Sequence, residues 1–193
     1  MTRIIAGEAG GRRLRTPPGD RTRPTSDRVR EALFSTLVSE LGSLAGVAFL
    51  DLFAGSGAVG LEARSRGARP VTLVESDRRV GAIARDNARS LGFADVEVSV
   101  RGAATFVTGP ARTAYGVVFL DPPYALDTTD VEALLAALVE HGWLAPRALV
   151  ILERSSRSPA PGWPAGLSGL RRREYGETVL WYGLATPPTV EEP

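Results

Sequence analysis

The 193-residue sequence has no cysteine, no lysine and only one histidine, His141. The absence of cysteine excludes disulfides, thiolate metal sites and cysteine nucleophiles. A single histidine also argues against a metal centre built from imidazole ligands, so we expect no metal. No apolar run approaches the roughly 20 residues that a membrane span requires, and the N-terminus lacks the apolar stretch of a signal peptide. We therefore expect a cytoplasmic protein that does not bind a membrane.

Positive charge is concentrated at the N-terminus, although the whole chain carries a net charge of only +1. Residues 1–30 hold eight arginines against three acidic residues. Because arginine supplies all 23 basic residues, composition alone explains many of them as solvated cations. Their clustering instead favours a surface that contacts nucleic acid. We expect five of these arginines to bind it: Arg3, Arg12, Arg13, Arg15 and Arg23.

Hydrophobic periodicity predicts an α/β fold with one main domain. Apolar residues recur at helical spacing over 27–41. From residue 47 onward, strands (47–53, 71–75, 95–100, 116–121, 147–153) alternate with helices (57–66, 77–91, 103–108, 128–141). Such alternation indicates a parallel sheet covered on both faces. Two last strands, 170–175 and 178–184, are joined by a tight turn, which predicts an antiparallel hairpin at the end of the sheet.

The two ends of the chain differ from this pattern. Residues 3–16 contain two short strand-like pieces around a glycine-rich turn, which predicts a β-hairpin. The last residues are rich in proline and acidic side chains, which is typical of a disordered tail. We therefore divide the chain into a basic N-terminal hairpin at 1–22, a main domain at 23–184 and a tail at 185–193.

The first candidate site follows the strand at 47–53. Gly55, Gly57 and Gly60 satisfy the pattern G-x-G-x-x-G, and Glu75 closes the next strand twenty residues after Gly55. This spacing predicts a nucleoside site, in which glycines let the backbone approach the ligand and the carboxylate accepts the ribose hydroxyls. The alternative is a tight strand-to-helix turn with a solvated acid. Asn87, on the next helix, could be structural or could face the ligand.

Asp51 favours one ligand class over another. A dinucleotide would bring a pyrophosphate to the start of the following helix, and a carboxylate four residues before the first glycine would oppose that charge. S-Adenosylmethionine presents an ammonium group and a sulfonium centre instead. Asp51 is therefore compatible with S-adenosylmethionine and unfavourable for NAD. The alternative is a buried acid satisfied by loop amides.

The second candidate site is Asp-Pro-Pro-Tyr at 121–124, directly after a strand. Pro122 and Pro123 fix two φ angles and remove two backbone donors, so Asp121 and the Pro122 carbonyl can serve as acceptors. Tyr124 would stack on a flat base. These groups suit an exocyclic amine, whose nitrogen can attack a methyl sulfonium in line, with alignment supplying most of the rate. The alternative is an ordinary strand-ending turn.

Together these residues resemble the RsmD-like guanine-N2 methyltransferases that act on 16S ribosomal RNA. The resemblance runs from Arg3 to about Leu184. It is carried by Arg-Ile-Ile-Ala-Gly at 3–7, Arg-Pro-Thr-Ser-Asp-Arg-Val-Arg-Glu at 23–31, Asp-Leu-Phe-Ala-Gly-Ser-Gly at 51–57, Glu75 and the 121–124 motif. The 23–31 segment is the most specific, because many amino methyltransferases share the other motifs.

The resemblance implies a class I S-adenosylmethionine-dependent methyltransferase fold, a Rossmann-like seven-stranded sheet whose last strand is antiparallel. It implies methyl transfer from S-adenosylmethionine, leaving S-adenosylhomocysteine, to N2 of a guanine in 16S rRNA. We expect a monomer that acts on an assembled or partly assembled small subunit. The implied cofactor contacts are Asp51, Phe53, Gly55, Ser56, Gly57 and Glu75, and the implied catalytic residues are Asp121, Pro122, Pro123 and Tyr124.

One departure from this family leaves a contact unassigned. Such enzymes commonly place an acid after the third strand to hold the adenine amino group, whereas this chain reads Val-Arg-Gly-Ala-Ala-Thr at 100–105. Two other functions also stay open: N-methylation of DNA adenine or of a protein glutamine, and a non-enzymatic RNA-binding role in ribosome assembly. The few residues outside the nucleotide domain favour structured RNA over duplex DNA as the substrate.

Overall fold

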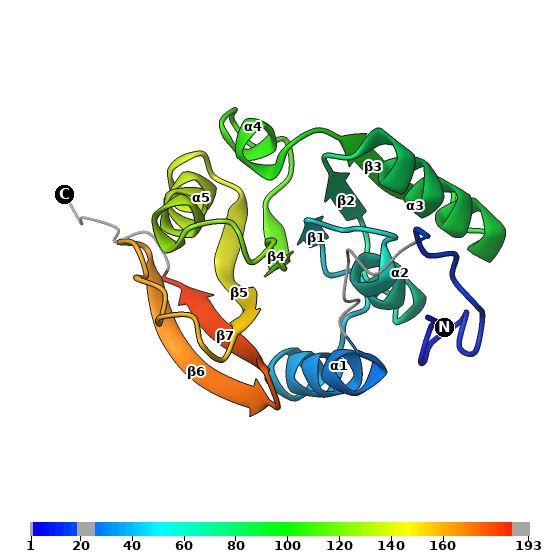
Figure 1. Ribbon diagram of the computed structural model, residues 1–193, viewed down its shortest axis with the longest axis horizontal. Coiled ribbons are helices and arrows are strands. Elements are labelled where there is room, and N and C mark those ends of the chain that lie inside the picture. The colour runs from blue at the N-terminus through cyan, green and yellow to red at the C-terminus, as the bar shows by residue number, and fades with distance from the viewer. Residues whose placement is uncertain (1, 19–25, 187–193) are drawn as a thin grey trace. The chain divides into compact units, whose positions relative to one another are not determined.

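The computed structural model describes residues 2–18 and 26–186. These residues form seven strands in the sheet order β3-β2-β1-β4-β5-β7-β6, which confirms the predicted seven-stranded α/β sheet (Figure 1). The chain divides into two compact units, Met1–Ala103 and Ala104–Pro193. Arg23 and the expected domain boundary after residue 22 lie outside the described residues.

The first unit begins with helix α1 (Asp27–Leu41), as predicted. The Ser26 hydroxyl accepts a hydrogen bond from the Val29 amide, and the helix ends at Gly42, whose φ of 74° suits glycine. The ring of Phe34 stacks on Phe49 with 6.3 Å between centroids, which packs α1 against β1. The helical spacing did not reveal that Arg30 also belongs to the buried face of α1.

The nucleotide half of the sheet is parallel, as expected. Strands β1 (Phe49–Leu52), β2 (Val71–Glu75) and β3 (Val96–Val100) pair side by side. Helix α2 (Ala58–Ser65) connects β1 to β2, and helix α3 (Arg78–Leu91) connects β2 to β3. Figure 1 shows both helices beside these strands. This arrangement places the ends of β1 and β2, which carry Asp51 and Glu75, on neighbouring parallel strands.

The N-terminal residues form less β-structure than predicted. Residues 3–16 do fold back as an antiparallel hairpin, but the ladder is short: it has one bridge, between Arg3 and Arg13, and backbone hydrogen bonds that join Ile4 to Arg12, Gly11 to Ile4 and Leu14 to Thr2. The ladder does not continue past Ile4, because the amides of Ile5 and Ala6 donate to the buried carboxylate of Glu62, at 2.6 and 3.0 Å. The segment therefore folds back on itself but is held mainly by α2.

The second unit contains α4 (Ala103–Val107) at its start, β4 (Tyr115–Leu120), α5 (Thr128–Glu140), β5 (Leu144–Ser155), β6 (Leu167–Tyr175) and β7 (Thr178–Ala185). Strands β4 and β5 are parallel, whereas β7 pairs antiparallel with both β5 and β6. This confirms the terminal antiparallel hairpin, whose tight turn contains Gly176 with a φ of 62°. Ala185, placed at the start of the predicted tail, is the last residue of β7.

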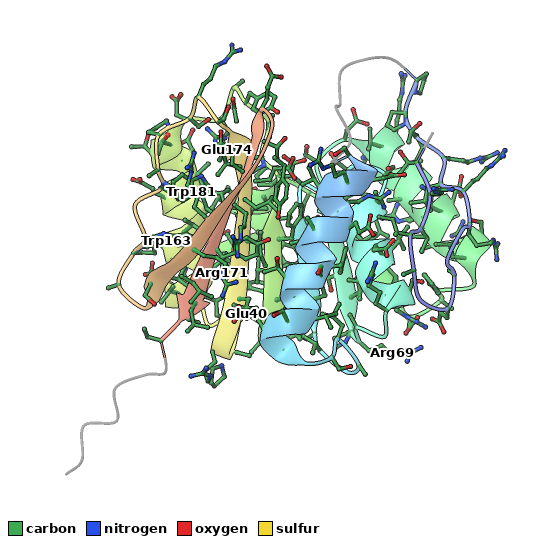
Figure 2. All side chains as sticks on the ribbon, turned by 90° about the horizontal axis from the view of Figure 1, so that it is seen from below. Glu40, Arg69, Trp163, Arg171, Glu174 and Trp181 are labelled. Atoms are coloured by element: carbon green, nitrogen blue, oxygen red, sulfur yellow. The ribbon has the colours of Figure 1, made fainter. Side chains whose placement is uncertain are left out.

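The hairpin is covered by Trp163, from the loop between β5 and β6 (Figure 2). Its indole lies over Gly169 and Gly183, which are paired across β6 and β7. A Cβ atom at Gly183 would lie 2.4 Å from the indole ring, so a side chain there would displace the tryptophan. Glycine at both positions therefore makes room for an aromatic cover over the sheet.

Two features are absent from residues 2–18 and 26–186. None of the helices there is long and apolar enough to cross a membrane. The same residues contain no group of three or more histidine, cysteine, aspartate or glutamate side chains that could hold a metal ion.

Candidate functional site

The loop between β1 and α2 has an unusual backbone. Phe53, Gly55 and Gly57 have φ values of 67°, 56° and 85°. Positive φ is uncommon for a residue with a side chain, and such conformations concentrate at functional sites. A Cβ atom added at Gly55 would meet no atom within 4 Å, so the backbone there borders open space. This is the property that a nucleoside-binding loop requires.

Gly57 and Gly60 serve packing instead. A Cβ atom at Gly60 would lie 2.1 Å from Cδ2 of Leu73 on β2, and one at Gly57 would lie 2.9 Å from Cδ1 of the same leucine. Without side chains at these positions, α2 can begin directly at Ala58 and pack against β2. The three glycines of the motif thus divide between an open ligand side and a close helix–strand contact.

Glu75 closes β2 and holds the loop. Its Oε2 accepts a hydrogen bond from the Gly55 amide at 2.9 Å, and its Oε1 accepts one from the Asp77 amide at 2.8 Å. Oε1 also accepts a hydrogen bond from the Ser76 hydroxyl at 3.3 Å. Because each carboxylate oxygen can accept two hydrogen bonds, Oε2 is the atom that retains capacity for a ribose hydroxyl. The residues therefore fit a nucleoside ligand, with the carboxylate already oriented by two backbone amides.

Asp51 is buried, with 1% of its surface exposed. Its Oδ2 accepts a hydrogen bond from the Gly60 amide at 2.8 Å. Burial raises the pKa of Asp51 from 3.8 to about 7; the Gly60 hydrogen bond opposes this shift, and the charge of Glu75 adds to it. The alternative considered for Asp51, a buried acid satisfied by a loop amide, is therefore correct for its Oδ2 atom. A direct cofactor contact at Asp51 stays a prediction.

Asn87 has the structural role that was one of the two considered for it, because its side chain links Arg15 to Ser56. Its side chain is 1% exposed and donates to the carbonyls of Ser56 and Arg15, both at 2.9 Å. Its Oδ1 accepts a hydrogen bond from the Arg15 amide at 2.8 Å. Sequence reasoning could not find these partners, because Arg15 lies 72 residues away along the chain.

The Asp-Pro-Pro-Tyr motif directly follows β4, at the end of a buried strand. Asp121 is half-buried, Pro122 is buried, and the side chain of Tyr124 is prominent, with 62% of its surface exposed. The Leu126 amide donates to the Pro123 carbonyl at 2.9 Å, which closes a turn after the second proline. The motif thus presents an aromatic ring to solvent from a rigid backbone.

The turn after Asp-Pro-Pro-Tyr is supported by a buried arginine, Arg154, which the sequence motif did not predict. Arg154, near the end of β5, donates from Nη2 to the Leu126 carbonyl at 2.9 Å. Its side chain is buried, so it acts as a fixed donor beneath the loop. Because an arginine in a strand is ordinarily read as a surface residue, its role could be found only from coordinates.

The predicted RNA-binding arginines of the N-terminal segment are exposed, and three of the four that are described also make intramolecular contacts. The Arg12 guanidinium donates to the Ser90 carbonyl at 2.5 Å. Arg15 lies 3.7 Å from the carboxylate of Asp86, and Arg3 lies 3.9 Å from that of Asp27. Such exposed ion pairs contribute little stability, so the charges stay accessible to a ligand.

The chain is similar to known proteins over almost its whole length. The family model described as "Conserved hypothetical protein 95" matches residues 2–183. Ribosomal RNA small subunit methyltransferase D from Escherichia coli K12 is 38% identical over 177 residues, which cover 92% of this chain and 86% of that protein. A Bacillus subtilis protein named putative rRNA methyltransferase YlbH is 32% identical, covering 91% of this chain and 95% of its own.

A solved structure shares the same fold. The putative methyltransferase yhhF from Escherichia coli superposes with a TM-score of 0.85 and 34% identity, covering 96% of this chain and 98% of that one. The match includes both the glycine-rich loop and the Asp-Pro-Pro-Tyr motif, because the family model extends from residue 2 to residue 183. The resemblance inferred from the motifs is therefore confirmed: the chain belongs to the Conserved hypothetical protein 95 family, which is the RsmD family of methyltransferases.

Proposed function

We propose that this protein transfers a methyl group from S-adenosylmethionine to the exocyclic N2 amino group of a guanine in 16S ribosomal RNA. The observation that carries the proposal is the family match over residues 2–183, whose relatives include proteins named as rRNA small subunit methyltransferases. Methylation of rRNA follows from that kinship. The guanine N2 target rests on the Asp-Pro-Pro-Tyr motif and on the family resemblance.

The first unit would hold the cofactor. S-Adenosylmethionine supplies a methyl carbon bonded to a positively charged sulfur. Glu75 would accept hydrogen bonds from the ribose hydroxyls, while the backbone at Gly55, which borders open space, lets the ligand approach closely. The ionised form of Asp51 would favour the positively charged part of the ligand. Phe53, Ser56 and Gly57 complete the set of proposed cofactor contacts.

The second unit would hold the acceptor base. Asp121 and the carbonyl of Pro122 would accept hydrogen bonds from the two amino N–H groups, which reduces conjugation of the nitrogen lone pair with the ring. Pro123 would fix the backbone, and the exposed ring of Tyr124 would stack on the base, an interaction worth about 1–3 kcal/mol. The nitrogen–carbon bond then forms as the sulfur–carbon bond breaks, S-adenosylhomocysteine leaves, and the nitrogen loses one proton to solvent.

Methyl incorporation tests the proposal. The protein is incubated with radiolabelled S-adenosylmethionine and, separately, with unmodified small subunits, naked 16S rRNA, DNA and a protein extract. The expected product is N2-methylguanosine, detected by nucleoside chromatography after digestion of the rRNA. Label in N6-methyladenosine of DNA or in methylglutamine would replace the proposal with the corresponding alternative. Cofactor binding without any methyl product would favour a non-enzymatic RNA-binding role.

The basic N-terminal segment is expected to supply salt-dependent affinity for RNA. Changing Arg12, Arg13 and Arg15 to glutamate should weaken rRNA binding at least about tenfold at low salt and flatten its salt dependence, because each lost phosphate contact lowers the slope of log K against log salt by roughly 0.7–0.9. Filter binding at several salt concentrations measures both quantities. Cofactor affinity without RNA should not change.

A matched control uses Arg157, whose side chain is 85% exposed in the second unit. Arg157→Glu changes the charge in the same sense but lies outside the N-terminal segment. An equal loss of RNA affinity per charge in this control would show that net charge, and not the segment, determines binding.

A further inference from the structure

The N-terminal segment is tied to the glycine-rich loop near both of its ends. Near the Arg15 end, the buried Asn87 side chain bonds the Arg15 backbone and donates to the Ser56 carbonyl. Near the Arg3 end, the guanidinium of Arg30 donates from Nη2 to the Arg3 carbonyl at 2.8 Å and from Nη1 to the Ala58 carbonyl at 3.3 Å. Each bridge is one side chain that contacts the segment and, at the same time, either Ser56 of the loop or Ala58, the first residue of α2.

Both bridging side chains are buried, at 1% exposure for Asn87 and 0% for Arg30. A buried polar group that loses a partner costs about 1–3 kcal/mol, more if it is charged. If the segment shifts, one of two things must follow. Either donors on Asn87 and Arg30 lose their partners, or these side chains move with the segment and away from Ser56 and Ala58. The carbonyls that they hold, on Ser56 and Ala58, flank Gly57, the residue that precedes α2.

We propose that Asn87 and Arg30 are positioning residues that couple RNA binding on segment 2–16 to cofactor binding on loop 53–57, so that each ligand increases the affinity of the other. This inference rests on the proposed function for the identity of the two ligands. RNA contacts made by Arg3, Arg12, Arg13 and Arg15 fix the segment, and the two bridges then restrict the loop to the conformation that binds the nucleoside. Thermodynamic linkage requires the same factor in both directions.

The test measures the affinity of S-adenosylhomocysteine by calorimetry, with and without a saturating 16S rRNA transcript. For the unaltered protein the RNA should tighten this affinity at least about fivefold, the lower end of ordinary coupling between sites. In Asn87→Ala the ratio of the two affinities should fall to about one. The RNA affinity, measured with and without S-adenosylhomocysteine, should show the same two ratios.

Ser65→Ala is the matched control. The Ser65 hydroxyl also fastens the segment, because it donates to the Ala6 carbonyl at 2.6 Å and accepts from the Ala9 amide at 3.0 Å. Ser65 lies at the end of α2, and its hydroxyl bonds to the segment and not to the loop, so Ser65→Ala should lower stability yet retain the coupling ratio. Equal loss of coupling in Ser65→Ala and Asn87→Ala would overturn the assigned role of Asn87.

A second variant covers the case in which Asn87→Ala does not fold. Arg30→Lys keeps the charge, but a single ammonium group cannot reproduce the two-armed contact with Arg3 and Ala58. Reduced coupling in this variant would support the proposal, and full coupling would contradict it. Absence of coupling in the unaltered protein would overturn the inference alone, whereas failure to methylate rRNA would overturn the proposed function and leave the measured coupling intact.

Discussion

Replacement of Asp121 by alanine is expected to lower the rate of methyl transfer to rRNA at least about a hundredfold, the usual cost of removing one preorganised group that acts on the transition state. Asp121 directly follows β4, and its carboxylate would accept a hydrogen bond from the amino group of the base. Single-turnover measurements with labelled cofactor give the rate. Calorimetry should show unchanged affinity for S-adenosylhomocysteine, because the proposed cofactor contacts all lie in residues 51–75.

Asp127→Asn is the control for this experiment. Asp127 is an exposed carboxylate in the same loop, and its side chain makes no capping hydrogen bond to α5. This change should leave the rate within about twofold of normal, since surface substitutions of this kind have small effects. Normal turnover in Asp121→Ala would show that the carboxylate does not act on the amine.

The stability of the fold is expected to decrease between about pH 4 and pH 7 because of Asp51. Its pKa is 3.8 when the chain is unfolded and about 7 in the folded state, so in this window the native state binds more protons. Stability then falls as pH rises. The contribution of protonated Asp51 to the free energy of unfolding is fully present below pH 3.8 and is lost as the pH rises to about 7. Three pKa units correspond to an upper limit of about 4 kcal/mol.

The variant Asp51→Asn isolates the contribution of Asp51 to the pH dependence of stability. Asparagine retains an oxygen for the Gly60 amide but cannot ionise, so Asp51→Asn should remove this part of the pH dependence and be more stable than the parent above pH 7. Urea denaturation at pH 5, 6, 7 and 8 measures the difference. Glu97→Gln, an exposed change on β3, is the control. Parallel curves for Asp51→Asn and the parent would contradict the raised pKa.

Most of the architecture could be predicted because it depends on local patterns. The helix at Asp27–Leu41 has both a serine cap and a glycine end in its sequence, and its bounds were predicted without error. The terminal hairpin was recognised from its Gly-Glu turn. The N-terminal hairpin was overestimated because its amides bond to Glu62, which lies 57 residues away from Ile5. No local pattern encodes that competition.

The same distinction applies to the candidate site. Glu75 and the glycine-rich loop lie within 20 residues of each other, and their spacing indicates a shared ligand. The hydrogen bonds made by Arg30, Asn87 and Arg154 were not predicted, because each residue is polar and buried and bonds to groups distant in sequence. Polar residues are usually expected at the surface, so their burial becomes apparent only when the folded partners are known.

The attachment of the N-terminal segment has a consequence for how this protein family can diversify. The side chains that hold the segment all bond to its main chain. Glu62 accepts from the amides of Ile5 and Ala6, Asn87 bonds to the amide and carbonyl of Arg15, and Arg30 donates to the carbonyl of Arg3. Since every residue type offers those carbonyls and all but proline those amides, the outward side chains can mutate while the anchorage persists. Changes in the outward side chains of the segment should therefore cost the fold little stability.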